Sequence, residues 1–172
     1  HGFGSSWIIP ETGILLNNRL TGFSLDPASP NIIAPGKRPA HTLNAFTVTN
    51  PDGTLHIVGG TPGANIQVQT NLQLIVNLVD LKMNVQEATE APRWQHLNAP
   101  GQSSDEETGT GVLEIENRVP TAVLDQLRAK GHDVRPLAAW GHGSSVQLMQ
   151  VLPNGTFAFG SDPRCEGHAS GI

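Results

Sequence analysis

The sequence predicts a layered α+β domain in which helices cover an antiparallel sheet, and three features of the 172-residue chain lead to this prediction. Two segments have the pattern of β-hairpins, because the turn sequences "PDG" (51–53) and "PNG" (153–155) each separate two strand-like runs. A long run with apolar residues at helical spacing follows the first hairpin. Hairpins with helices packed on the outside are typical of this layered class.

The first part of the chain, residues 1–45, is rich in loop signals. The run "WIIPETGILLNN" predicts two short apolar strands around a turn at 10–13. Four prolines between residues 27 and 39 predict an extended surface connection. The first hairpin follows, with the strand-like runs "AFTVTN" and "TLHIVGG" on either side of its turn.

A long helix is predicted from Ala64 to Leu81. Its apolar residues occupy most of the helix circumference, so we expect it to be buried between a sheet and another layer. The run "NVQEATEAPRW" predicts a second, short helix that is capped by Asn84 and stops before Pro92.

The last third of the chain alternates between helix and strand signals. Residues 98–111 are expected to form a polar loop, and "GVLEIENRV" predicts a strand. "VPTAVLDQLRAKGH" predicts an amphipathic helix with Pro120 near its start and Gly131 at its end. The runs "SSVQLMQVL" and "TFAFG" complete the second hairpin.

Composition argues against several classes of partner. The net charge of −5, without a basic patch, argues against nucleic acid. No apolar run reaches the length of a membrane span, so no membrane partner is expected. The seven histidines show no zinc-ligand spacing, and phosphate-loop and dinucleotide motifs are absent, so we expect no metal and no cofactor. One cysteine excludes an internal disulfide, and both cytoplasm and periplasm remain open.

The segment "GGTPGAN" (59–65) joins the first hairpin to the long helix. The first turn of a helix has backbone N–H groups without partners, and small residues let a ligand approach them closely. In acyl transfer such groups form an oxyanion hole. The alternative is a tight connection whose glycines serve packing only, and the segment by itself favours this alternative.

Several segments together resemble the small subunit of the gamma-glutamyltranspeptidase family. They occur in the family's order and at plausible spacing along nearly the whole chain: "TGILLNNRLTGFS" (12–24), "PGKRPAHTLNAF" (35–46), "GGTPGANIQVQ" (59–69), "NVQEATEAPRW" (84–94) and "GSDPR" (160–164). The resemblance implies an N-terminal nucleophile hydrolase with a four-layer αββα fold. In this family one precursor cuts itself into a large and a small subunit, and the new N-terminal threonine of the small subunit attacks an amide to form an acyl-enzyme.

The resemblance assigns residues to an oxyanion hole and to a substrate pocket. The N–H groups of Gly63 and Ala64 correspond to the oxyanion hole, and Asn65 beside them is expected to contact substrate. Arg19 and Gly22 stand at pocket positions where the family has a polar residue and an aspartate that binds the substrate's α-amino group. The family's serine pair, which holds the α-carboxylate, corresponds to His41 and Thr42 in this sequence.

These pocket differences change the expected substrate. Without the aspartate, and with Arg19 nearby, a γ-glutamyl group with a free α-amine is disfavoured, whereas a carboxylate or a neutral polar acyl group is favoured. The short stretch between Phe23 and Lys37 predicts an open cleft for larger amides, as in the acylase-like members of the family.

The family's threonine would lie upstream of His1. Residues 1–172 are therefore expected to form a single-domain portion of the small subunit, without the nucleophile segment, whose partners are the large subunit of the same precursor and a small acyl-amide substrate. The function predicted from the sequence is an amide hydrolase or acyltransferase. The alternative is a non-catalytic relative that binds a ligand or a partner.

Overall fold

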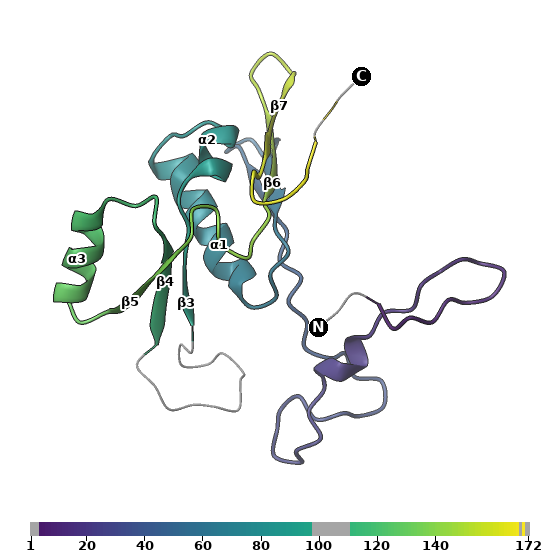
Figure 1. The fold of residues 1–172 in the computed structure, drawn as a ribbon. Helices are drawn as coiled ribbons and strands as arrows, with labels where there is room; N and C mark the ends of the chain where they lie inside the picture. Colours follow the sequence, from purple (N-terminus) through teal and green to yellow (C-terminus); the bar gives the residue numbers. More distant parts are fainter. Residues whose placement is uncertain (1–3, 98–110, 169, 171–172) are drawn as a thin grey trace. The chain divides into compact units, whose positions relative to one another are not determined.

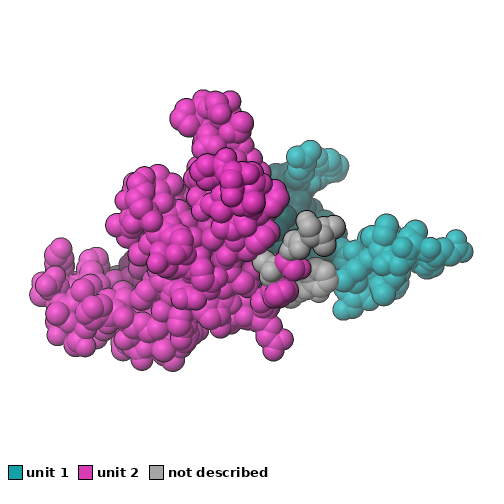
Figure 2. All heavy atoms as spheres, turned by 90° about the horizontal axis from the view of Figure 1, so that it is seen from above, with its two compact units in different colours: residues 1–43 teal, residues 44–172 magenta. Residues whose placement is uncertain are grey.

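The computed structural model describes residues 4–97, 111–168 and 170 of the chain. The chain divides into two compact units, residues 1–43 and residues 44–172 (Figure 2), and each is described by itself. The predicted polar loop at 98–111 lies outside the described residues, apart from Gly111. The expectation that 1–172 is a single domain stays a prediction.

The first unit contains little regular structure. Its helical element is the short 3-10 helix η1 (Arg19–Gly22). Ile8 bridges Leu15, and the Ile9 N–H donates to the Ile14 carbonyl at 2.9 Å, so the apolar strand pair predicted around 10–13 forms only as an isolated bridge. None of the unit's described residues is buried, and its large apolar side chains are exposed, among them Trp7, Ile14, Leu20, Leu25 and Leu43.

The second unit is built on a four-stranded antiparallel sheet with the strand order β1-β2-β6-β7 (Figure 1). The strands β1 (Phe46–Thr49) and β2 (Leu55–Gly60) form the first predicted hairpin. The strands β6 (Gln147–Val151) and β7 (Phe157–Ser161) form the second. Both hairpin predictions are therefore confirmed, and the two hairpins join through the pairing of β2 with β6.

The predicted long helix is confirmed as α1 (Ile66–Ile75), which continues as one π-helical segment, η2 (Val76–Asp80). The short helix α2 (Val85–Glu90) is also confirmed. The Asn84 side chain accepts the backbone N–H of Glu87, and the Glu87 carboxylate accepts the backbone N–H of Asn84, which is a complete capping box.

A hydrophobic core lies between this sheet and these helices. It contains apolar side chains from the sheet, from α1 and η2, from α2, and from the segment before β6: Ile57, Leu74, Leu78, Val85, Ala88, Val146 and Leu148. The expectation that α1 is buried around most of its circumference is wrong for this chain. Val68 and Leu72 are 62% and 56% exposed, because only one side of the helix faces this core.

A second, smaller sheet has the strand order β3-β4-β5. The predicted strand is confirmed as β4 (Val112–Glu116), and the predicted amphipathic helix as α3 (Thr121–Ala129). The strands β3 (Trp94–Leu97) and β5 (Asp133–Leu137) were not predicted. β4 and β5 are parallel and α3 connects them, so this sheet departs from the antiparallel expectation. Its core contains Leu113, Ile115, Leu124 and Val134.

Two glutamines of α1 pair with the backbone of the edge strand β3. The carboxamide of Gln69 donates to the His96 carbonyl at 3.0 Å and accepts the His96 N–H at 2.7 Å. Gln73 makes the same pair of bonds to Trp94, at 2.9 and 3.1 Å. The two side chains thus satisfy backbone groups that an edge strand would otherwise leave free. Among the helices that the structure describes, none is long and apolar enough to cross a membrane.

We expect Gln73→Met to destabilise the protein by about 1–3 kcal/mol, because a side chain of similar length leaves the half-buried N–H and carbonyl of Trp94 without partners. Urea-induced unfolding of the whole protein measures this change. The matched control is Gln126→Met on an exposed position of α3, which should stay within about 0.5 kcal/mol of the wild type. Equal stabilities for the two variants would contradict the pairing role.

Candidate active site

The segment 59–65, which we call the elbow, leads from the end of β2 into α1 (Figure 1). The Gly63 carbonyl accepts the Ile66 N–H at 3.0 Å, and the Ala64 carbonyl accepts the Gln67 N–H at 3.3 Å, which starts the helix. Within the part of the chain that the structure describes, the N–H groups of Gly63 and Ala64 donate to no protein acceptor. Two adjacent backbone donors are therefore available at the positive end of α1.

The backbone of the elbow has an unusual conformation. Gly63 has φ +135°, and a Cβ at this position would lie 2.7 Å from Cγ1 of Ile66, so only glycine fits. Ala64 has φ +48°, in the left-handed region that costs a residue with a Cβ about 1–2 kcal/mol. Asn65 is exposed, and its side chain makes no capping hydrogen bond to α1. Its contact with substrate stays a prediction.

We expect Ala64→Gly to stabilise the protein by up to about 1 kcal/mol, because glycine adopts the positive φ of Ala64 without steric strain. The substitution keeps the backbone N–H group at position 64. Thermal unfolding of the whole protein measures the effect.

The matched control is Ala122→Gly in α3, where the same substitution in a helical residue should destabilise by about 0.5–1 kcal/mol. A loss of stability at both positions would contradict the left-handed conformation of Ala64.

The predicted pocket residues of the first unit lie on two segments that contact each other. A Cβ at Gly22 would lie 2.8 Å from the Ala40 carbonyl oxygen, so the end of η1 lies directly against the segment that continues to His41 and Thr42. Asn31 holds the two segments together: its Nδ2 donates to the Gly22 carbonyl, and its Oδ1 accepts the Ala40 N–H at 3.1 Å. Sequence reasoning missed Asn31, and no local signal in the sequence indicates it.

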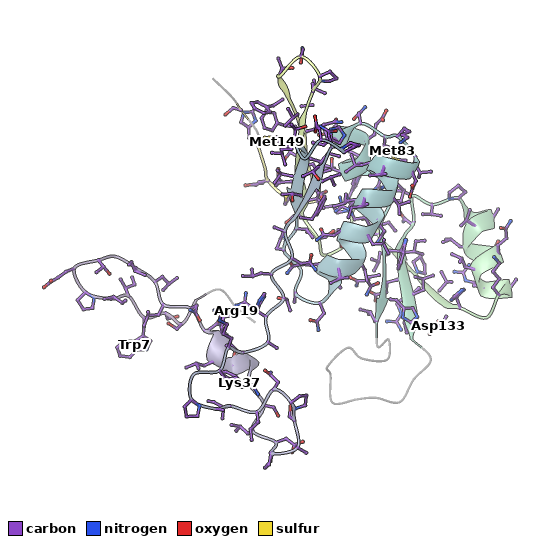
Figure 3. All side chains as sticks on the ribbon, turned by 180° about the vertical axis from the view of Figure 1, so that it is seen from behind. Trp7, Arg19, Lys37, Met83, Asp133 and Met149 are labelled. Carbon is purple, nitrogen blue, oxygen red and sulfur yellow. The ribbon has the colours of Figure 1, made fainter. Side chains whose placement is uncertain are left out.

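Arg19 is the first residue of η1 (Figure 3). Its backbone N–H donates to Oδ1 of Asn17 at 2.9 Å. Its guanidinium makes no hydrogen bond or ion pair with any residue of the described ranges. The elbow belongs to the second unit, whereas the four predicted pocket residues Arg19, Gly22, His41 and Thr42 belong to the first. Their joint role in one site therefore stays a prediction.

Sequence reasoning also missed a group of buried charges, which we call the charge cluster: Arg93, Glu116, Asp162 and Arg164. Arg93 pairs with Asp162, and Arg164 pairs with both Glu116 at 2.6 Å and Asp162 at 2.9 Å. All four side chains are at most 2% exposed. The cluster joins the start of β3, the end of β4 and the segment after β7, so it connects the two sheets.

The electrostatics of the cluster favour the charged forms of its two carboxylates. Burial by itself would raise the pKa of Glu116, but hydrogen bonds from Arg164 and Arg118 outweigh it and lower the pKa to about 2. Burial likewise opposes the charge on Asp162, and the N–H groups of Val146 and Arg164 together with Arg93 hold its pKa below the usual value. Outside the cluster, the Arg118 guanidinium also pairs with Glu116 and lies 3.4 Å from the ring centre of Trp140.

His142 lies beside this cluster and is buried, with 4% exposure. Its backbone N–H donates to Glu116, and its Nδ1 accepts the Ser144 N–H at 3.2 Å, so the ring proton of the neutral form belongs on Nε2. Burial, and after it the positive charge of Arg93, lower the pKa of His142 to about 4. The imidazole is therefore neutral at physiological pH.

We expect His142 to make the protein less stable as the pH falls from about 6.5 to about 4. In this window the unfolded chain binds a proton at His142 and the folded chain does not, so protonation favours unfolding. The full effect is roughly 3 kcal/mol, since one pKa unit corresponds to about 1.4 kcal/mol. Glu116 acts in the same direction but at lower pH, between about 4.5 and 2.

Urea-induced unfolding at several pH values measures this dependence, with His142→Asn as the comparison, because its Oδ1 can still accept the Ser144 N–H. The variant should lose less stability than the wild type between pH 6.5 and 4. Parallel curves for the two proteins would show that His142 is not the titrating group.

The fold is the α+β arrangement of N-terminal nucleophile hydrolases, as the comparison with solved structures shows. A cephalosporin acylase from Bacillus halodurans matches with a TM-score of 0.76 at 32% identity, covering 97% of this chain and 30% of that one. A mutant gamma-glutamyltranspeptidase from Helicobacter pylori matches with a TM-score of 0.74 at 30% identity, covering 95% of this chain and 88% of that one. The expected fold class is therefore confirmed.

The family model described as gamma-glutamyltranspeptidase matches residues 1–172. The chain belongs to the gamma-glutamyltranspeptidase family. An oxamate amidohydrolase proenzyme of Klebsiella pneumoniae is 38% identical over 175 residues, which covers 99% of this chain and 31% of the relative. The chain thus spans 31% and 27% of the length of two of the curated relatives that it matches.

Proposed function

We propose that the protein is an amide hydrolase or acyltransferase that works through an acyl-enzyme on an N-terminal threonine upstream of His1. In this proposal the Gly63 and Ala64 N–H groups stabilise the oxyanion that forms when the threonine attacks the amide carbonyl. The partner is the large subunit of the same precursor, and the substrate is a small acyl-amide.

The observation that carries this proposal is the pair of available donors at the start of α1. An oxyanion hole needs preorganised donors that have no other acceptor, because the developing charge must not compete with an existing hydrogen bond. Ala64 meets this need as well as a glycine would, since it keeps the N–H while it adopts a positive φ. Membership of the family supports the role of this segment in acyl transfer.

The pocket supports an acyl group without a free α-amine. Any side chain at position 22 would bring its Cβ within 2.8 Å of the Ala40 carbonyl oxygen, so an aspartate does not fit there unless the backbone moves. Arg19, on the same helical turn, would repel a substrate ammonium group and attract a carboxylate. The name of one relative, an oxamate amidohydrolase, denotes an amide that carries a carboxylate.

The remaining predicted substrate contacts are assigned within the same proposal. His41 and Thr42 stand where the family has its serine pair, so we assign them to the far end of the acyl group. Thr42 supplies one hydroxyl in place of two, and His41 adds a larger ring. Asn65, exposed beside the elbow, is assigned to a polar group near the scissile amide.

The test compares two anilides that differ only in the α-amine, γ-glutamyl anilide and glutaryl anilide, with the purified whole protein. We expect kcat/KM to be at least about tenfold higher for glutaryl anilide, since even one charge repulsion of about 1.4 kcal/mol gives this factor. Arg19→Gln should reduce the ratio between the two substrates. A higher kcat/KM for γ-glutamyl anilide would contradict the assigned pocket.

Mass spectrometry of the same preparation tests the catalytic proposal separately. It should show a large subunit and a small subunit that begins with threonine, and the latter should gain the mass of the acyl group on brief exposure to substrate. If the small subunit lacks this threonine and neither anilide is turned over, the results would instead support a non-catalytic binding module.

A further inference from the structure

We propose that Thr61 is a positioning residue that fixes the direction of the Gly63 N–H. The inference rests on the proposed function, because it concerns one of the two assigned oxyanion donors. It adds a side chain to an oxyanion hole that otherwise consists of backbone groups alone.

Both hydrogen-bonding roles of the Thr61 hydroxyl are used. Its Oγ1 donates to the Pro62 carbonyl at 2.7 Å and accepts the backbone N–H of Ser145 at 3.0 Å. A hydroxyl has a single proton, so accepting from Ser145 leaves that proton directed at Pro62. Thr61 is 9% exposed, whereas Pro62 and Ala64 are exposed, so a buried side chain holds an exposed turn of backbone.

The position of the Pro62 carbonyl determines that of the Gly63 N–H. The two groups belong to the same peptide unit, which is planar, and no cis bond occurs among the described residues. In a trans peptide the carbonyl and the N–H point in opposite directions. Because the Pro62 carbonyl faces the buried Thr61 hydroxyl, the Gly63 N–H points away from that hydroxyl, and the proposal places the substrate carbonyl on this opposite side.

A glycine at this place makes such a restraint necessary. Gly63 has φ +135°. Because glycine has no Cβ, its backbone would also tolerate the φ that results if the peptide unit between Pro62 and Gly63 turned over. After this rotation the N–H would point inward, and the oxyanion hole would lose one donor. The hydrogen bond from Thr61 to Pro62 opposes the rotation directly.

The other side of the Thr61 hydroxyl is anchored by the charge cluster. Ser145 lies between two residues that the cluster holds: the Ser144 Oγ accepts from Arg93 at 2.8 Å, and the Val146 N–H donates to Asp162 at 2.8 Å. Ser144 and Val146 are 2% and 0% exposed. The Ser145 N–H is therefore a fixed donor, and it fixes the orientation of the Thr61 hydroxyl.

Substitution of Thr61 can test the direction of the Gly63 N–H without changing the backbone at position 63. Proline at position 63 would remove the N–H, but its ring requires a φ near −65°, and Gly63 has +135°. Thr61→Val instead keeps the shape of the side chain and removes the hydroxyl. Thr61→Ser keeps the hydroxyl.

The experiment measures kcat and KM of the whole protein on glutaryl anilide. We expect Thr61→Val to lower kcat by about 10–100-fold with KM within about twofold, because loss of one complete oxyanion donor lowers kcat about 10²–10³-fold and the donor here is only misdirected. Thr61→Ser should retain kcat within about threefold of the wild type. The matched control is Thr70→Val in α1, since Thr70 is fully buried and its hydroxyl has no partner among the described residues.

Each outcome decides the question. A Thr61→Val variant with wild-type kcat, or with a raised KM alone, overturns the positioning role, as does an equal loss in Thr70→Val. If Thr61→Val does not mature, Thr61→Ala receives the same assay, and failure of both shows that the hydroxyl is required for folding and overturns the positioning role. A wild type without turnover on either anilide overturns the proposed function first and this role with it.

Discussion

The charge cluster is the interaction on which the second unit depends. Arg93 and Glu116 lie at the ends of neighbouring strands of the smaller sheet, and Asp162 and Arg164 follow the last strand of the larger one. Each charge is buried, so each must be neutralised within the protein, and breaking such a pair costs about 3–5 kcal/mol. An apolar contact between the sheets would tolerate sliding. A bidentate pair such as Arg164 with Glu116 fixes distance and direction together.

The fixed geometry of the charge cluster matters for the elbow because hydrogen bonds connect the two. Arg93 and Asp162 hold the residues on either side of Ser145, and the Ser145 N–H reaches Thr61 at the base of the elbow. A strained, glycine-containing turn thus rests on a part of the protein with little freedom to move. The left-handed conformation of Ala64 agrees with this arrangement, since strained backbone persists only where surrounding contacts impose it.

The parts of the fold that the sequence predicted are those with local signals. The hairpins have their turn residues, α2 has its capping box at Asn84, and α3 has Pro120 and Gly131 at its ends. The strands β3 and β5 have no such signal. β5 contains Pro136, and β3 is held by Gln69 and Gln73 of α1, which lie 27 and 21 residues before their partners in the sequence. The members of the charge cluster are far apart in the sequence, and in isolation each resembles an ordinary surface charge. The candidate oxyanion residues were found through resemblance, because the elbow alone could not be distinguished from a packing turn.

The candidate site divides into a part made of backbone and a part made of side chains, and the two tolerate change differently. An N–H donor is present in every residue except proline, so the second elbow position can be alanine as long as its φ is positive. The proposed pocket positions would have no such freedom, because an aspartate, a glycine and an arginine there would present different charges to an acyl group. Gly22 illustrates this directly: the close approach of the Ala40 carbonyl leaves no room for a carboxylate side chain. A family with this construction can keep its acyl-transfer chemistry while the acyl group it accepts changes.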